Sequence, residues 1–416
     1  MKKIKKLVLV ECEMKKPKGH FLNNLIDTTI SFENKFDIYW ILNKKFNKNK
    51  TYIPKVKSII KCVSTNKFKR NENKFLYSIE EIFYLFKNIL LIFYYFNVFL
   101  KEKKISHYYR ALKSNYFILP RYFGSFYPSY QKLKFNKSDH IFFTTARRKD
   151  IALVNFLTKI DSNHPNFHIR VMLPPKIKFK GFFYYLREIN NVLKKNRAFI
   201  YLWSDFNFKL FIKNSSNKSN IFKSNIPWTF YNRKYKKNNH TIGFIGDARR
   251  ARGFHLLPKL IKMLEAKNKS FNYLIHFSKI SDDLIETKKE LYKLAKYNNK
   301  IKIVEKYSDY NEFLGYLKKI DIMPILHSAA EINAVTSGTL YSCVPYEIPI
   351  VVPFGTEFMK NIQKFKSYEK AKNVTEFANK IYNISKKYQF YLNNMKLNSK
   401  ILKKILKKDP LQINIS

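Results

Sequence analysis

The sequence predicts an α/β protein built from two doubly wound, Rossmann-like domains that face each other across a cleft. Short apolar runs alternate with helical patterns, this alternation occurs twice, and a polar segment separates the two occurrences. Such alternation is typical of parallel βαβ units with right-handed crossovers. The chain has 416 residues, 45% of them hydrophobic, which is enough to fill two cores of ordinary size.

The first predicted domain covers residues 1–213. Its strands are expected where β-branched and aromatic residues form short apolar runs, at 6–11, 37–42, 140–144, 168–173 and 198–203. Its helices are expected at 20–32, 78–101, 148–160 and 182–196. The basic start of the chain precedes an apolar run of four residues, which is too short for a signal peptide. We interpret that run as the first strand.

Residues 82–100 are apolar over a length that would cross a bilayer. Lys87, Asn88 and Asn97 interrupt the apolar run, and polar groups at such positions are costly in lipid. We therefore expect a buried helix of the first domain. A helix at a membrane interface and a true span are the alternatives.

Residues 214–239 are rich in Ser, Asn and Lys, and we interpret them as a linker. The second predicted domain, 240–375, repeats the strand and helix pattern. Its strands are expected at 241–246, 272–277, 301–304, 321–325 and 349–353, and its helices at 253–266, 282–296, 309–319, 337–346 and 357–363. The tail, 376–416, is expected to form basic helices that pack back on the first domain.

The formal net charge of +50 favours anionic partners, such as phosphorylated substrates, anionic lipid or nucleic acid. A coding bias toward A and T accounts equally well for the abundance of Lys and Asn. A nucleic-acid partner is not expected, because no recognisable reader motif accompanies the charge. The three cysteines and nine histidines lack the spacing of a disulfide framework or a metal site. We therefore expect a cytoplasmic protein without a metal.

Three arginines lie in one predicted turn, within the stretch TIGFIGDARRARGFHLLPKLIKML at 241–264. Open α/β sheets bind their ligands at such turns. Gly246 ends the strand where the backbone must turn sharply, and Gly253 opens a helix whose N–H groups favour an anion. Arg249 and Arg252 are three residues apart and suited to hold one phosphate from two sides. The alternative is that these arginines only coat a basic surface.

This stretch resembles the opening strand, loop and helix of the C-terminal domain in GT-B-fold glycosyltransferases. In that family the loop carries an Arg and a Lys, or a second Arg, that contact the nucleotide diphosphate. Arg249 and Arg252 fall on those positions, followed by Gly253. The resemblance implies that the two arginines stabilise the departing diphosphate without a metal.

Residues 331–357, EINAVTSGTLYSCVPYEIPIVVPFGTE, resemble a second family segment, in which a helix precedes a GxPVV strand. The start of that helix carries Gly or Ser against the phosphates. The resemblance therefore implies that Ser337, Gly338 and Thr339 contact the phosphates of the donor.

Two residues of this second segment depart from the family pattern. Ser342 stands about where the family has a ribose-binding Glu, and Glu347 stands where a Gly usually precedes the Pro. Glu331 is the nearest upstream carboxylate. We consider it either a replacement for the ribose ligand or a solvated loop residue.

A third, shorter match is the KGHF sequence at 18–21, after the first strand. It resembles the N-terminal glycine loop of the family, which lies against the donor from the opposite domain. Gly19 would let the backbone approach the diphosphate, and His20 would contact the sugar or acceptor, or act as the base of an inverting enzyme. A purely structural histidine is the alternative. Residues 144–148 also end a strand, and would hold an acceptor or phosphate, or simply cap a helix.

The resemblance implies a metal-independent hexosyltransferase, with a nucleotide-diphosphate sugar as co-substrate and no other cofactor. Its acceptor would be a glycan or lipid-linked glycan of cell-surface polysaccharide or lipopolysaccharide synthesis. The net charge adds a peripheral association with the inner face of an anionic membrane. The alternatives are a catalytically inactive GT-B-like binding subunit, an epimerase or phosphorylase of the same fold, and a basic nucleic-acid-binding protein.

Overall fold

The computed structural model describes most of the chain. The described residues are 4–12, 14, 20–43, 45–46, 52–62, 119–171, 180–194, 197–202, 205–215, 217–225, 229–267, 270–329, 332, 338–356 and 364–416. The chain forms two compact units. The first comprises Met1–Pro17, Asn24–Ser224 and Asn414–Ser416, and the second Lys18–Asn23 and Asn225–Ile413.

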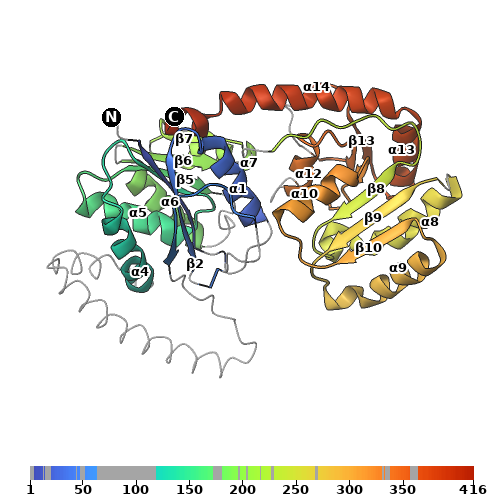
Figure 1. Cartoon of the computed structure of the whole chain (residues 1–416), viewed down its shortest axis with the longest axis horizontal. Coiled ribbons are helices and arrows are strands. Elements are labelled where there is room, and N and C mark those ends of the chain that lie inside the picture. The colour runs from blue at the N-terminus through green and yellow to red at the C-terminus, as the bar shows by residue number, and fades with distance from the viewer. Residues whose placement is uncertain are drawn as a thin grey trace. The chain divides into compact units, whose positions relative to one another are not determined.

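The first unit contains a seven-stranded parallel sheet (Figure 1). Its strands are β1 (Lys6–Glu11), β2 (Asp37–Asn43), β3 (Ser58–Cys62), β4 (His140–Phe143), β5 (Asn166–Val171), β6 (Ala198–Leu202) and β7 (Ile221–Lys223). They are hydrogen-bonded in the order β3-β2-β1-β4-β5-β6-β7. The direction in which strands are added reverses at β1, so the switch point of this doubly wound sheet lies between β1 and β4.

Helices cover both faces of this sheet. The described ones are α1 (His20–Phe32), α4 (Leu119–Lys132), α5 (Arg148–Ile160), α6 (Lys180–Leu193) and α7 (Asp205–Asn214). Side chains of α4 to α7 form one core with alternate strand residues, among them Ile41 of β2. The neighbouring Trp40 points to the opposite face, where its Nε1 donates to Thr29 Oγ1 of α1 at 2.9 Å. Burial on both faces explains why these strands are continuous apolar runs.

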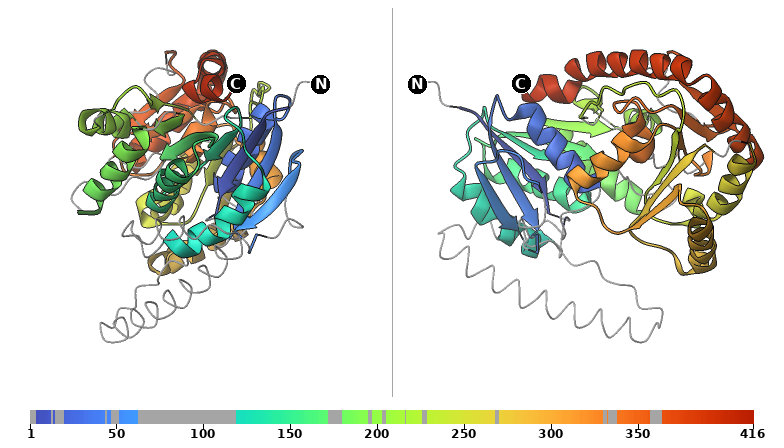
Figure 2. Two further views of the ribbon diagram at one scale, coloured as in Figure 1. Left: turned by 90° about the vertical axis from the view of Figure 1, so that its left-hand side faces the viewer. Right: turned by 45° about the vertical axis from the view of Figure 1, so that its right-hand side comes forward.

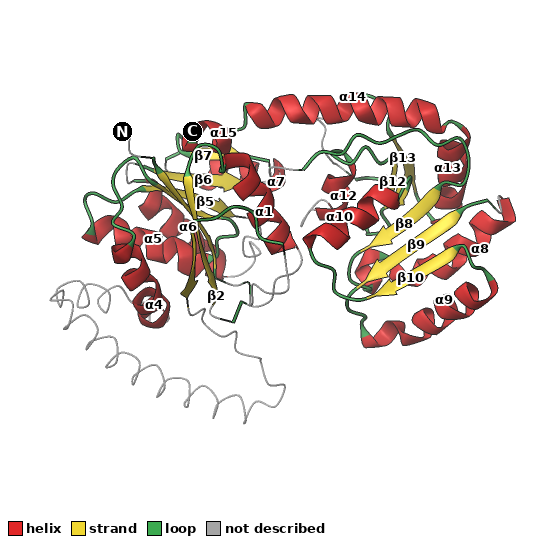
Figure 3. Ribbon diagram, in the orientation of Figure 1, coloured by secondary structure: helices red, strands yellow, loops and turns green. Residues whose placement is uncertain are grey.

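The second unit contains two three-stranded parallel sheets that a bridge joins (Figure 3). The first has the order β10-β9-β8 and the second β11-β12-β13, with bounds β8 (Thr241–Ile245), β9 (Asn272–Phe277), β10 (Ile301–Glu305), β11 (Met323–Pro324), β12 (Ile350–Pro353) and β13 (Tyr368–Ala371). Ile242 bridges to Ile322, and Gly243 N donates to Ile322 O at 3.0 Å. The combined order is that of a doubly wound sheet whose switch point lies between β8 and β11.

Two cores fill the second unit. Its helices are α8 (Leu257–Lys267), α9 (Ile285–Tyr297), α10 (Tyr310–Lys319), α12 (Gly338–Cys343), α13 (Val374–Lys386) and α14 (Tyr388–Lys407), and α15 (Pro410–Ile415) follows at the end of the chain. Helices α8, α9 and α13 contribute to one core, and α10 and α12 to the other. Figure 2 shows two further views of these elements.

The tail is the first point at which the prediction needs correction. Helix α14 packs within the second unit, with Leu392 in one core and Met395 and Leu402 in the other. The last three residues belong to the first unit, where Asn414 Nδ2 donates to Tyr201 OH at 3.0 Å. Helix α14 therefore belongs to the second unit, whereas the prediction had assigned the tail helices to the first domain. The amphipathic pattern of α14 indicates that one face of the helix is buried, but it does not indicate in which unit.

The predicted linker is a second correction. Residues 221–223 form β7, which pairs with β6 and extends the first sheet. Helices predicted at 78–101 and 357–363 lie outside the described residues. In the ranges that the structure describes, no helix is long and apolar enough to cross a membrane.

Arg233 anchors the segment that precedes β8 to the second unit. Its side chain is almost completely buried, at 3% exposure. The guanidinium donates to three backbone carbonyls, those of Leu317 at 2.8 Å, Lys318 at 3.2 Å and Tyr346 at 3.2 Å. These contacts tie the former linker to the end of α10 and to the turn before β12.

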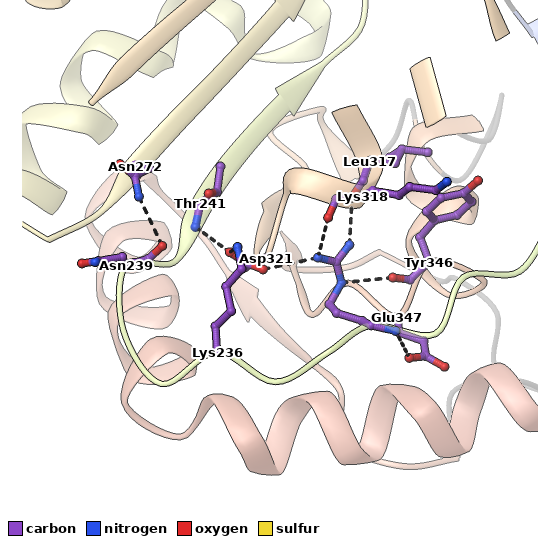
Figure 4. A network of polar contacts seen from close by, with 10 residues as sticks. Lys236, Asn239, Thr241, Asn272, Leu317, Lys318, Asp321, Tyr346 and Glu347 are labelled. Atoms are coloured by element: carbon purple, nitrogen blue, oxygen red, sulfur yellow. Dashed lines mark hydrogen bonds and ion pairs between the residues drawn. The ribbon is translucent and has the colours of Figure 1, made fainter. Parts of the chain in front are cut away.

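The carboxylate of Asp321 completes this network (Figure 4). Its Oδ1 lies 3.3 Å from Arg233 Nη1, and its Oδ2 accepts from Lys236 Nζ at 3.1 Å and from Thr241 N at 2.9 Å. The Asp321 side chain is fully buried. A buried carboxylate needs such partners, because an unpaired charge in the interior is very costly.

Candidate functional site

The loop after β8 lies at the switch point of the second unit. It runs from Gly246 to Gly253 and contains the 3-10 turn Arg250–Arg252. A second 3-10 turn, Phe254–Leu256, follows the loop and leads into α8. The helix therefore begins at Leu257, four residues later than predicted. Ligands of doubly wound sheets bind at the carboxyl ends of strands beside the switch point. This places the loop where the sequence predicted a site.

Gly246 leaves room for the side chain of Arg252. Its φ of 146° lies in the region that favours glycine. A Cβ added to Gly246 would come within 2.5 Å of Arg252 Nη1. The guanidinium thus lies directly against the backbone at the end of β8. The glycine and the arginine, two of the predicted site residues, are brought together.

The resemblance implies that this loop contacts a nucleotide diphosphate, and Gly246→Ala is then expected to weaken that contact at least about tenfold. The added methyl group displaces Arg252, and loss of one charge-assisted contact to a phosphate costs about 1.5–3 kcal/mol. Strain at the positive φ would also lower stability by about 1–3 kcal/mol. Calorimetric titration with nucleoside diphosphates measures the first effect. Gly315→Ala in α10 is the matched control, because a Cβ there meets no described residue within 4 Å. Equal loss of binding in both variants would refute the steric argument.

Gly253 has a different role from the predicted one. Its φ is 71°, and an added Cβ would lie 2.3 Å from Leu326 O. The N–H of Gly253 donates to Arg250 O at 2.9 Å, and that of Phe254 to Arg249 O at 3.3 Å. These amide groups are thus engaged within the loop. Gly253 lets the loop pack against the chain just after β11.

Arg249 and Arg250 both have acidic partners. Arg249 Nη2 lies 2.7 Å from Asp247 Oδ2, while Asp247 Oδ1 accepts from Ser278 Oγ at 2.9 Å. Arg250 Nε lies 3.0 Å from Asp283 Oδ2. The side chains of Arg249 and Arg250 are more than half exposed. Surface pairs of this kind are weak, so an anionic ligand would readily draw Arg249 from Asp247.

The two motifs of the second domain meet at the end of β8. Thr339 Oγ1, near the start of α12, donates to Ile245 O at 3.2 Å. Gly338 is exposed, and among the described residues nothing lies within 4 Å of the position of its absent Cβ. As far as the described residues show, the surface beside Gly338 is therefore open next to the loop of Gly246. Ser342 is buried, and its Oγ donates to Gly338 O at 2.8 Å inside the helix.

His327 is a site residue that the sequence analysis missed. It follows β11, across the switch point from Gly246, and Leu326 before it contacts Gly253. Burial, followed by the nearby charge of Arg252, lowers the pKa of His327 to about 4. Its imidazole is thus neutral at neutral pH. A neutral ring beside a guanidinium offers a hydrogen-bonding group without adding to the positive charge.

Other predicted residues are described in part or not at all. Gly19, Glu331 and Ser337 lie outside the described residues. His20 is the first residue of α1, as predicted, but its side chain is not described. Among the residues that are described, no group of three His, Cys, Asp or Glu side chains is suited to hold a metal ion. Metal independence stays a prediction.

In the first unit, residues 144–148 act as a strand end and helix cap. Thr144 Oγ1 donates to Glu11 Oε2 at 2.8 Å, across the switch point between β1 and β4. Asp150 Oδ2 accepts from Arg147 N at 2.7 Å, so the Asp150 side chain caps the start of α5. These contacts support the capping interpretation of the segment.

Comparisons with known proteins show where this fold recurs. No family model and no curated protein matches the sequence. Sucrose-phosphate synthase from Thermosynechococcus elongatus aligns with a TM-score of 0.57 and 9% identity, over 97% of this chain and 95% of that chain. The Anabaena protein HepE, in complex with UDP and glucose, aligns with a TM-score of 0.54 and 13% identity, over 99% and 97%. The α,α-trehalose 6-phosphate synthase from Burkholderia multivorans aligns with a TM-score of 0.54 and 7% identity, over 99% and 95%.

These solved structures are GT-B glycosyltransferases, and the likeness extends over nearly the whole of each chain. The protein therefore has the GT-B fold, and the predicted fold class is confirmed. At 7–13% identity the likeness defines the fold and leaves the activity to be argued from the site.

Proposed function

We propose that this protein is a glycosyltransferase whose donor is a nucleotide-diphosphate sugar. One observation carries the proposal: Arg252 lies against Gly246, and Thr339 binds the strand end just before Gly246, at the switch point of the second unit. It supplies positive charge and an open surface where doubly wound sheets bind phosphates. HepE is described in complex with UDP and glucose, which supports uridine diphosphate as the first nucleotide to test.

In the proposed reaction, the bond between the anomeric carbon of the sugar and the diphosphate oxygen breaks. The negative charge that grows on the diphosphate is stabilised by Arg249 and Arg252, and Arg249 exchanges Asp247 for a phosphate. The neutral imidazole of His327 lies beside Arg252 and is available to donate or accept a hydrogen bond. An acceptor hydroxyl then forms the new bond to the anomeric carbon, and its proton passes to the departing diphosphate.

We propose a glycan or lipid-linked glycan as acceptor, in cell-surface polysaccharide or lipopolysaccharide synthesis. The first unit would hold this acceptor, and the protein would act in the cytoplasm, at the inner face of the membrane. The net charge of +50 supports this assignment, because phosphorylated lipid carriers and anionic membranes are both attracted to such a protein.

A panel of nucleotides tests the donor. Uridine diphosphate is expected to raise the melting temperature. At a concentration of one hundred times its dissociation constant, it would add about 2.7 kcal/mol to the free energy of unfolding. Guanosine, adenosine and cytidine diphosphates and the matching nucleotide sugars complete the panel. Stabilisation by RNA with no response to any nucleotide would overturn the proposal and favour the nucleic-acid-binding alternative.

A catalytically inactive GT-B-like binding subunit is the second candidate. Ser342 favours it, because this residue stands near the ribose-binding position of the family and its hydroxyl is turned back to Gly338 O. Such a protein would bind the nucleotide sugar but release no nucleoside diphosphate when acceptors are added. A coupled assay for nucleotide release, run on protein already shown to bind the nucleotide, separates the two candidates.

A further inference from the structure

A lysine-lined pocket lies at the opposite end of the second unit's sheet from the proposed nucleotide site. Its volume is about 970 Å³. Asn239 and His240, which precede β8, lie on its wall, as does Ser270, which precedes β9. The nucleotide loop follows the carboxyl end of β8. Five strand residues, each advancing about 3.3 Å, separate these two ends by about 16 Å. One ligand in each place would not compete with the other.

Positive charge predominates in this pocket, where Lys366 alone of the five lining lysines has an ion pair among the described residues, with Glu369 at 3.1 Å. Five lysines and no carboxylate belong to its lining. Lys267 Nζ lies 6.0 Å from the centre of the Tyr382 ring, and Lys386 Nζ lies 4.6 Å from the same centre. Among the ion pairs of the described residues, none involves Lys267, Lys386 or Lys387. Two ammonium groups thus lie near one aromatic ring without a carboxylate partner, and an anionic ligand would supply the missing negative charge.

Aromatic side chains at the pocket are exposed as well as buried. Phe390 is 51% exposed and Tyr235 is 49% exposed. Tyr235 stacks on the buried Tyr388 at 6.3 Å between ring centres, and Phe390 packs edge-on against Tyr391 at 5.4 Å. Exposed rings on a rigid aromatic base, beside lysines, are typical of surfaces that bind at the interface of a membrane.

We infer that this pocket, at the corner between α13 and α14, binds the headgroups of an anionic phospholipid membrane. The occupant is a lipid surface and not a free phosphate, because the pocket is far larger than one phosphate and its exposed rings have apolar area to bury. Lysine acts as a point charge that tolerates varied headgroup positions. Single-stranded nucleic acid, which also binds to lysines and exposed rings, is the alternative occupant, and the RNA titration below tests it.

The inference deepens the membrane part of the proposed function and places the contact on the second unit. It does not depend on the nucleotide site, since none of the pocket residues belongs to the loop Gly246–Gly253. Lys386 ends α13 and Lys387 follows it, so substitutions there leave both cores intact.

Vesicle sedimentation of the full chain tests the inference. Wild-type protein is expected to pellet with vesicles of phosphatidylcholine and phosphatidylglycerol, to stay in solution with phosphatidylcholine alone, and to be released by salt. Lys386→Glu with Lys387→Glu is expected to lower the partition coefficient at least about tenfold. Phe390→Ser is expected to lower it several-fold without changing the salt dependence. Binding of uridine diphosphate and the melting temperature are expected to stay unchanged in both variants.

The matched control is Lys293→Glu with Lys296→Glu on α9, which changes the net charge equally at exposed positions away from the pocket. Equal loss of vesicle binding in the control would overturn the inference in favour of general charge. Unchanged binding in the pocket variant would also overturn it. Inorganic phosphate and an RNA oligonucleotide are titrated alongside. If either one binds in a way that depends on the pocket lysines and the protein does not bind anionic vesicles, the membrane inference is wrong and that ligand is the occupant of the pocket.

Discussion

Replacing both Arg249 and Arg252 by alanine is expected to lower the affinity for uridine diphosphate about a hundredfold, or about 3 kcal/mol. The rate of sugar transfer is expected to fall further, because the two guanidinium groups face a diphosphate whose charge grows as its bond to the sugar breaks. Calorimetric titration measures the affinity, and initial-rate kinetics measure kcat/KM.

A double variant of equal charge serves as control. Arg250 lies in the same loop and pairs with Asp283, and Lys262 on α8 pairs with Glu290 at 2.6 Å. Replacing these two by alanine removes the same two charges from exposed pairs, and we expect less than about a threefold loss of affinity. If this control loses as much as the Arg249 and Arg252 variant, general electrostatic attraction explains the binding and the proposed phosphate site is wrong.

The sequence predicted the central strands of both sheets and the edge strand β10, and it missed the edge strands β3, β7 and β13. Central strands are buried on both faces and form continuous apolar runs, such as KLVLVE of β1. The strands that were missed have weaker patterns: β3 is half-exposed, β7 has three residues, and β13 reads YEKA. An edge strand pairs through its backbone on one side, so its side chains carry little of the signal.

The candidate site was also predicted only in part. The arginine loop was found because glycines and arginines follow a buried strand. His327 was missed, although the strand before it had been predicted, because only the order of β8 and β11 in the sheet makes their ends neighbours. A search of every predicted strand end for titratable residues would have found it.

Glu347 illustrates how an unusual residue keeps a backbone conformation. The sequence placed it where a Gly usually precedes the Pro, and its φ is 54°, in the left-handed region. Its carboxylate compensates for the strain by accepting from Arg233 N at 2.8 Å, while burial raises the pKa of the carboxyl group. A glutamate thus adopts a left-handed backbone conformation at this turn, and its side chain has a structural role.

Arg233→Ala is expected to lower the free energy of unfolding of the second unit by about 3–5 kcal/mol. The substitution leaves the Asp321 carboxylate buried without its guanidinium partner, and three carbonyls lose a donor. Urea unfolding followed by circular dichroism gives the free energy. Hydrogen exchange at the amides of β8 is expected to locate the loss in the second unit, because Thr241 N donates to the same carboxylate.

Lys236→Ala shows how much of the effect of Arg233→Ala on stability comes from the burial of the ion pair. Lys236 pairs with the other oxygen of Asp321 at 3.1 Å, but its side chain is 48% exposed, whereas that of Arg233 is 3% exposed. Water replaces the ammonium group at the exposed position, so we expect a loss under about 1 kcal/mol. Arg233→Met combined with Asp321→Leu is expected to cost less than Arg233→Ala, because no charge is then left unpaired. Equal losses from Arg233→Ala and Lys236→Ala would show that the network stabilises the unit through net charge and not through its buried geometry.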